Sequence, residues 1–181
     1  MDDLEVGRTP KRQTINLRFE GGTNCDGALR DLAQNNTTGK QPDGSYVADL
    51  KSKEIAPLLD PSHKPSNKDV VGPNGECVDL TKKFSGMSKD DVGTYQWKPG
   101  SKVDKDTRPG TAIATFNDKG RYPSKSGWNS GLVLGPGTKG SIWVLDQWPG
   151  HPPEPREIPL NNNALPANNS GAYSVILVED K

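Results

Sequence analysis

The residue in this sequence with the clearest chemical potential is a cysteine at the head of a predicted helix. Gly86 is placed to end this helix. The residues that recur at helical spacing before it are Cys77, Leu80, Thr81 and Phe84. A cysteine in a first turn lies beside free N–H groups and the positive end of the helix dipole, which stabilise a thiolate over a thiol. Taken by itself, however, the position favours a buried apolar residue, because buried cysteine is common. The neighbouring sequence has to decide between a nucleophile and a core residue.

The other soft ligands are few. The chain holds two cysteines, Cys25 and Cys77, and two histidines, His63 and His151. None forms a C-x-x-C or H-x-x-x-H pair, so the sequence predicts no metal site and no cofactor. A Cys25–Cys77 disulfide is one alternative, and a reactive thiol is the other.

Composition excludes several classes of protein. The 181 residues carry 23 Lys and Arg against 23 Asp and Glu, a formal net charge of zero. Nucleic acids and anionic membranes both require a basic surplus or patch, so neither is a predicted partner. The longest apolar run, at 175–178, is far shorter than the roughly 18 residues of a membrane span. The N-terminus has no charged segment followed by an apolar one, so we expect no classical signal peptide.

The chain divides at about residue 72. We predict a polar N-terminal extension with weak secondary structure over 1–71 and one domain over 72–181. Within the extension we expect a strand at 14–19, helices at 26–34 and 48–56, and a linker at 61–67. After the helix at 77–86, apolar runs predict strands over 111–116, 131–134, 141–145 and 172–178. One helix followed by antiparallel strands is an α+β pattern.

Four segments resemble, in order, those of small bacterial cysteine amidases. Residues 74–86 are similar to a G-x-C-V-x-x-V-K segment and residues 95–100 to W-x-x-G. Residues 110–123 resemble a G-T-A-I-A-T-F…G-R-Y-P signature, and residues 142–148 an I-W-V-x-D-Q-W strand. The family is papain-like, is related to CHAP and NlpC-type peptidoglycan hydrolases, and is often found among type VI secretion effectors. The resemblance covers roughly residues 72–181 and implies a papain-like fold.

The resemblance also implies a catalytic triad. Cys77 matches the nucleophile, which implies a free sulfur rather than a disulfide to Cys25, and Asp146 is the best match for the residue that orients the histidine. Where the family has the histidine itself, this chain has Asn129. An asparagine amide does not titrate near neutral pH, so it cannot take the thiol proton and return it to the leaving amine. We expect Asn129 to approach the sulfur and to hydrogen-bond Asp146 or Gln147.

Neither histidine replaces the missing one in this interpretation. We predict that His151, beside two prolines, is a solvated loop residue, and His63 in the linker is a weaker candidate still. The expected cleft walls are Trp128 and Trp148, since tryptophans at strand ends can line a binding site, although core packing is their more common role. The further expected substrate contacts are Arg121, Tyr122 and Gln147.

Three functions remain open. The first is a peptidoglycan amidase or endopeptidase that cuts a peptide stem through Cys77, weakened or inactive because Asn129 replaces the histidine. The second is a catalytically silent module on the same fold that binds cell wall or protein. The third is a structural or virion-associated domain docked by its first 70 residues. By the resemblance, the substrate is the peptide stem, an immunity or delivery protein is the expected partner, and the protein reaches the periplasm or cell wall of a target cell.

Overall fold

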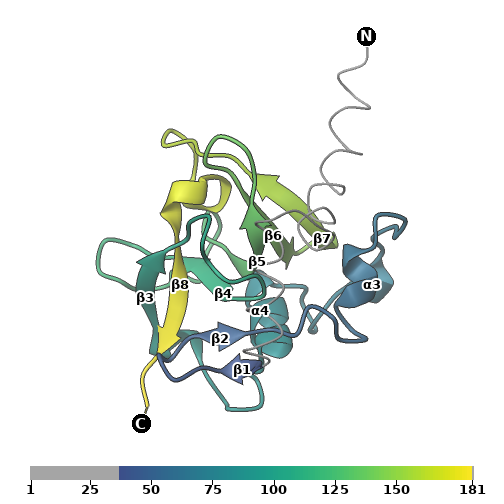
Figure 1. Ribbon diagram of the computed structural model, residues 1–181, viewed down its shortest axis with the longest axis horizontal. Coiled ribbons are helices and arrows are strands. Elements are labelled where there is room, and N and C mark those ends of the chain that lie inside the picture. Colours follow the sequence, from purple (N-terminus) through teal and green to yellow (C-terminus); the bar gives the residue numbers. More distant parts are fainter. Residues whose placement is uncertain (1–36, 181) are drawn as a thin grey trace.

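A six-stranded antiparallel sheet forms the body of the protein (Figure 1). The computed structural model describes residues 37–180. The strand order is β3-β8-β4-β5-β6-β7. The strands are β3 (Trp97–Lys102), β4 (Ala112–Thr115), β5 (Ser130–Pro136), β6 (Ile142–Trp148), β7 (His151–Ile158) and β8 (Tyr173–Val178). The predicted central strands are therefore confirmed, with shifts of one to three residues at most of their ends.

Helix α4 (Cys77–Ser85) packs across strands β4, β5 and β6. It begins at Cys77 and ends at Gly86, whose φ of 95° is the left-handed conformation that glycine adopts at no steric cost. Leu80 and Thr81 are fully buried against the sheet. The predicted helix and its C-terminal glycine are both confirmed.

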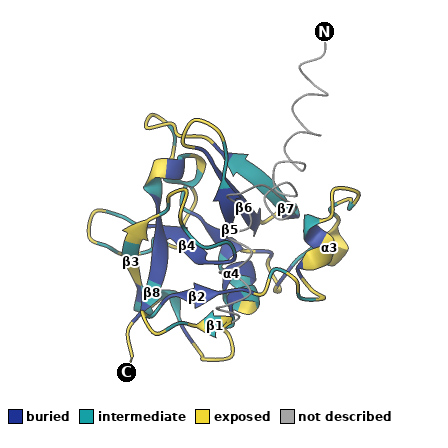
Figure 2. Ribbon diagram, in the orientation of Figure 1, coloured by how far each residue is buried: buried dark blue, intermediate teal, exposed yellow. Residues whose placement is uncertain are grey.

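The two faces of the sheet carry separate apolar clusters. Trp143 and Leu145 of β6 belong to the cluster that includes Leu80 of α4. Ile142 and Val144 belong to the cluster on the opposite face. This alternation is the two-residue period of a strand, and Figure 2 shows β4, β5, β6 and β8 as the most buried part of the fold.

The packed unit reaches further toward the N-terminus than the boundary predicted at residue 72. A two-stranded sheet, β1 (Gly39–Lys40) and β2 (Tyr46–Val47), lies beside the main one. The buried side chains that residues 46–71 add to the helix-side core include Tyr46, Ile55, Leu58 and Val71. These isolated apolar residues do not form a periodic pattern, which is why the sequence of this segment predicts only a polar extension.

Several local predictions fail in this segment. The helix expected at 48–56 is absent, and a short helix α3 (Ala56–Leu59) begins where it was to end. Short 3₁₀ turns occur at η1 (Asn67–Asp69), η2 (Thr94–Gln96), η3 (Pro166–Asn168) and η4 (Ser170–Ala172). The strand predicted at 14–19 and the helix predicted at 26–34 lie outside the described residues.

The two strands of the main sheet that the sequence did not predict are its two edges. β3 contains Pro99 and Gly100, and β7 has prolines at positions 152, 153 and 155. Proline cannot donate to a ladder and is tolerated on edge strands, where one side of the strand needs no partner. β7 begins at His151, so this histidine is a strand residue and not the loop residue that the sequence predicted.

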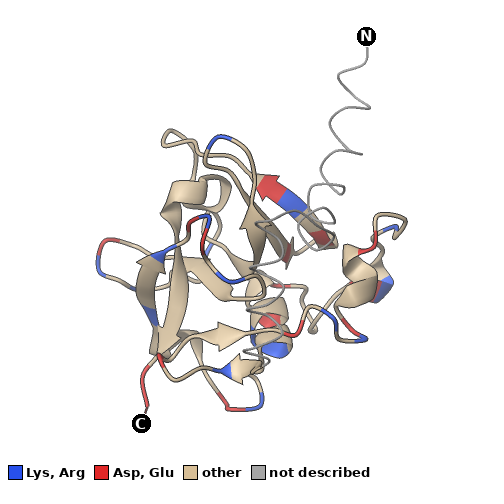
Figure 3. Cartoon of the chain, in the orientation of Figure 1, with Lys and Arg blue, Asp and Glu red and all other residues tan. Residues whose placement is uncertain are grey.

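Charges of both signs are interspersed over the loops and the surface of the fold (Figure 3). Within residues 37–180, no helix is both long and apolar enough to cross a membrane.

Candidate active site

A groove of about 1050 Å³ opens at the start of α4. Its walls come from the first turns of α4, the loop before β5, the end of β6 and the segment around η3. The sequence-predicted residues that line it are Cys77, Tyr122, Trp128, Asn129 and Trp148. The tertiary structure thus brings together five of the eight predicted site residues.

Cys77 is a free cysteine and is 7% exposed. The preceding residues turn into the helix at Gly75, whose φ is 66°, and the N-cap residue Glu76 makes no side-chain capping bond. Farther along the helix, the Thr81 hydroxyl donates to the Cys77 carbonyl at 2.9 Å and lies 2.9 Å from the Ser130 hydroxyl. The start of the helix is therefore tied to β5, with its first amide groups uncapped.

The polar contact of the Cys77 sulfur is Tyr122, whose hydroxyl lies 3.3 Å from Sγ. The ring of Tyr122 packs on Trp97, with 5.1 Å between the centroids. Burial, followed by the neighbouring Cys77, raises the pKa of Tyr122. The phenol therefore stays neutral at physiological pH and is not a base for the thiol. The sequence placed Tyr122 among substrate contacts, and the structure places its hydroxyl against the Cys77 sulfur.

Asn129 is buried and lies directly before β5. Its amide nitrogen donates to Asp146 Oδ2 at 2.6 Å and to the Tyr173 hydroxyl at 2.9 Å. The predicted bond to Asp146 is confirmed, whereas the hydrogen-bond partner of the Cys77 sulfur is Tyr122 and not Asn129. Both amide hydrogens are used, so only the carbonyl oxygen of Asn129 remains to accept a hydrogen bond.

Asp146 is 1% exposed and is held by an arginine that the sequence did not single out. The Arg156 Nε lies 3.0 and 2.9 Å from the two carboxylate oxygens, and Nη2 lies 2.9 Å from Oδ2. Burial raises the pKa of Asp146, while the charge of Arg156 and the bond from Asn129 oppose that rise. Asp146 thus orients Asn129 from within a closed network.

Tyr173 completes that network. Its hydroxyl accepts from Asn129 and donates to the Ala167 carbonyl at 2.9 Å. Burial, followed by the nearby Asp146 charge, raises the pKa of Tyr173. Sequence reasoning missed both Arg156 and Tyr173. The signal for Tyr173 was a polar-tipped aromatic at the start of a predicted strand, and Arg156 was hidden in a proline-rich run.

Gln147 and Arg121 do not line the groove, contrary to the prediction. Gln147 is fully buried and bonds backbone groups of Val71 and Glu76. Arg121 is an exposed loop residue whose backbone N–H donates to Asn117 Oδ1. Alternation along β6 directs Gln147 to the face covered by α4, where its amide is used on the backbone that precedes the helix.

Trp148 lies at the rim of the groove, 39% exposed. Its ring stacks on His151 with 3.9 Å between centroids, and the Arg156 guanidinium lies 5.2 Å from its centroid. His151 Nε2 is 3.2 Å from Glu154 Oε1, outside the groove lining. His63 pairs with Asp69 at 3.0 Å. Neither histidine is a lining residue of the groove, and within residues 37–180 no cluster of His, Cys, Asp or Glu is arranged to hold a metal ion.

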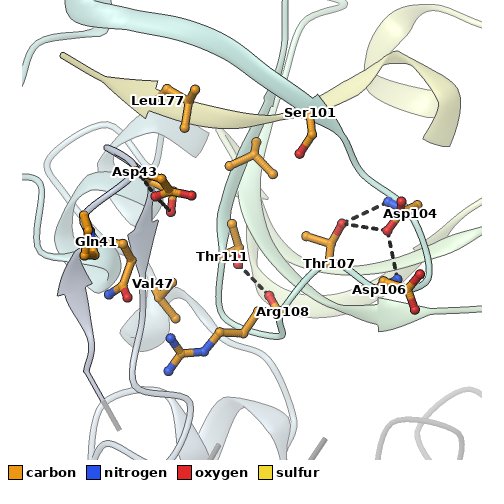
Figure 4. A pocket seen from close by; sticks show the side chains of 13 residues that line it. Gln41, Asp43, Val47, Ser101, Asp104, Asp106, Thr107, Arg108, Thr111 and Leu177 are labelled. Atoms are coloured by element: carbon orange, nitrogen blue, oxygen red, sulfur yellow. Dashed lines mark hydrogen bonds between the residues drawn. The ribbon is translucent and has the colours of Figure 1, made fainter. Parts of the chain in front are cut away.

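A second hollow of about 550 Å³ lies between the β1–β2 hairpin and the loop after β3 (Figure 4). Its acidic side chains are engaged locally: Asp43 accepts from Ser45, and Asp104 accepts from the Asp106 and Thr107 groups of its own loop. The residues that line it include no cysteine and no histidine. The groove at Cys77 is therefore the better candidate for covalent chemistry.

A cysteine that begins a helix packed on an antiparallel sheet, beside the pair Asn129 and Asp146, is the arrangement of a papain-like α+β fold. The sequence profile of the family described as domesticated amidase effector 2 matches residues 50–176. The chain belongs to this family.

Two relatives agree with that assignment. The type VI secretion amidase effector 2 protein of Salmonella typhi is 37% identical over 89 residues, which are 48% of this chain and 62% of that protein. The match therefore spans less than two thirds of the relative's length. The solved structure of the type 6 secretion amidase effector 2 (Tae2) superposes with a TM-score of 0.50 at 30% identity, covering 61% of this chain and 86% of the other.

Proposed function

We propose that this protein acts on the peptide stems of peptidoglycan as a cysteine amidase whose turnover is strongly reduced. Two observations together carry the proposal: Cys77 lines the groove, and Asn129 donates both its amide hydrogens to Asp146 and Tyr173. The family to which the chain belongs, named for amidase effectors, supports the substrate class.

This site supports attack of the thiolate on the amide carbonyl, but it lacks a group that protonates the leaving amine. The Cys77 thiolate would add to an amide carbonyl, with uncapped amides at the start of α4 available to the oxyanion. The tetrahedral intermediate must then lose its amine, which has to be protonated to leave as a neutral group. An imidazole would deliver the proton taken from the thiol, and Asn129 cannot. The acyl-thioester would therefore form slowly, from the small thiolate fraction present without a base.

Asn129→His tests this account directly. An imidazole there would donate from Nδ1 to Asp146 as the amide does now, and its other nitrogen could serve the sulfur. We expect turnover of purified peptidoglycan to rise about 10²–10⁴-fold, the usual contribution of general acid–base transfer. Released peptides would be quantified by chromatography and mass spectrometry.

Two matched variants control the comparison. Asn129→His combined with Cys77→Ala should return to background, which shows that the product arises at the thiol. Asn129→Gln alters the same position without adding a titratable group and should not gain activity. Full turnover by the unaltered chain would contradict the proposal and would direct attention to His151.

A silent binding module on the same fold is the second candidate, favoured by the engagement of both Asn129 hydrogens. It predicts that insoluble peptidoglycan retains the Cys77→Ala variant as well as the unaltered protein. It also predicts that Trp148→Ala weakens retention and that Asn129→His yields no product.

We also propose delivery to the periplasm of a target cell and an immunity or delivery protein as partner, because the relatives are named as type VI secretion effectors.

A further inference from the structure

The side chain of Gln147 uses its whole amide on one short segment of backbone. Its Oε1 accepts from the Val71 N–H at 2.9 Å, and its Nε2 donates to the Val71 carbonyl at 2.7 Å and to the Glu76 carbonyl at 2.8 Å. Gln147 is 0% exposed, so these bonds do not compete with water. Both donors of the amide group are spent.

The segment that Gln147 binds leads directly into the nucleophile. Glu76 is the N-cap of α4, and Cys77 is its first residue. Residues 71–76 form no regular element, and they turn through Gly72 and Gly75, whose φ values of 79° and 66° are left-handed. Because no strand pairs with the backbone of this loop, the hydrogen bonds from the Gln147 side chain fix its position.

Gln147 and Asp146 are consecutive residues of β6 that serve opposite sides of the site. Strand alternation directs Asp146, with Val144, toward one face and Gln147, with Leu145, toward the face covered by α4. Asp146 thereby holds Asn129, while Gln147 holds the approach to Cys77. One strand end thus sets the positions of both halves of the groove.

We infer that Gln147 is a positioning residue, whose side-chain amide fixes residues 71–76 and so sets where the Cys77 sulfur lies relative to position 129. This inference rests on the proposed function only where turnover is concerned, since the order of the loop is measurable without any substrate. Replacement by methionine keeps the length of the side chain and removes all three bonds. Replacement by glutamate keeps the acceptor for Val71 and removes both donations.

Hydrogen–deuterium exchange of the full chain tests the anchoring. In Gln147→Met we expect amides in residues 71–79 to exchange at least about tenfold faster, while amides of β8 change far less. Gln147→Glu, which also places a carboxylate against two carbonyl oxygens, should show the same localised effect. Ile113→Val, a substitution in the opposite core cluster, serves as the control for general destabilisation and should speed exchange throughout the sheet. Equal acceleration in residues 71–79 and in β8 in both Gln147 variants would overturn the inference.

Turnover supplies the second readout, in the Asn129→His background. There Gln147→Met should lower kcat at least about tenfold and change KM less than about twofold, because the groove walls stay in place while the nucleophile is misplaced. Gln41→Met is the matched control: its amide also donates to two backbone carbonyls, those of Thr37 and Gly39, but in the β1–β2 region. A kcat unchanged by Gln147→Met would overturn the inference. If Asn129→His itself shows no turnover, the proposed function fails, and the exchange result alone decides the role of Gln147.

Discussion

The two halves of the groove differ in how many hydrogen bonds their side chains make. On the helix side, the Cys77 sulfur meets the Tyr122 hydroxyl and otherwise faces the groove. On the strand side, Asn129, Asp146, Tyr173 and Arg156 bond one another in a buried network. The helix side thus presents a cysteine with one polar neighbour. In the strand-side network, the side-chain carbonyl oxygen of Asn129 is the acceptor that the described residues leave without a hydrogen bond.

The largest effect should come from opening the strand-side network. Arg156→Met leaves the buried Asp146 carboxylate without its cation, and removing one partner of such a pair typically costs about 3–5 kcal/mol. Urea denaturation at pH 7 would measure the loss of unfolding free energy. Lys105→Met is the control, because its pair with Asp106 is exposed and should contribute almost nothing.

The pH dependence of the same variant sharpens the comparison. Burial raises the pKa of Asp146, and Arg156 opposes that rise. Without the arginine, the folded state should bind a proton more tightly than the unfolded state does, so stability should recover as the pH falls. We expect the deficit of Arg156→Met to be smaller at pH 5 than at pH 8. A deficit that grows on acidification would show that Asp146 does not depend on Arg156.

A smaller effect should separate the two tyrosines. Tyr122→Phe removes the hydroxyl from the sulfur, whereas Tyr173→Phe removes one from Asn129. The form of Cys77 that reacts is the thiolate, and a hydrogen bond to a charged group contributes about 1.5–3 kcal/mol. Without the Tyr122 hydroxyl, alkylation of Cys77 by iodoacetamide at pH 7 should therefore slow about tenfold. Tyr173→Phe should leave the rate within about twofold, because its hydroxyl does not contact the sulfur. A Cys25→Ser background leaves Cys77 as the one thiol, and equal rates in the two variants would remove the distinction between the halves.

The smallest effect is expected at alkaline pH. Burial raises the pKa values of both Tyr122 and Tyr173, so the folded state holds their protons more tightly than the unfolded state, in which tyrosine titrates near 10. Their contribution is present below about pH 10 and is lost as the pH rises above it. Each Phe variant should therefore lose less stability than the unaltered protein between pH 9 and 11, measured by urea denaturation. Identical losses in all three proteins would contradict this assignment.

Local sequence determined the helix and the centre of the sheet. Cys77, Leu80 and Thr81 recur at helical spacing before a glycine, and the central strands are short apolar runs. These signals are local, because spacing and capping act within a few residues. The edge strands β3 and β7 were hidden by their prolines, which are typical of loops and are tolerated here because no strand of the described sheet pairs beyond them.

For the site, the sequence determined which residues have chemistry, and the tertiary structure determined what each can do. The resemblance singled out Cys77 and the departure at Asn129, and the sequence predicted that Asn129 bonds Asp146 or Gln147. The roles of Tyr122, Arg156 and Gln147 were not, since each is defined by a contact with a residue outside its own local segment. Gln147 meets Val71 across 76 positions of sequence. Such contacts carry no local periodicity, so only folding of the sheet against α4 decides them.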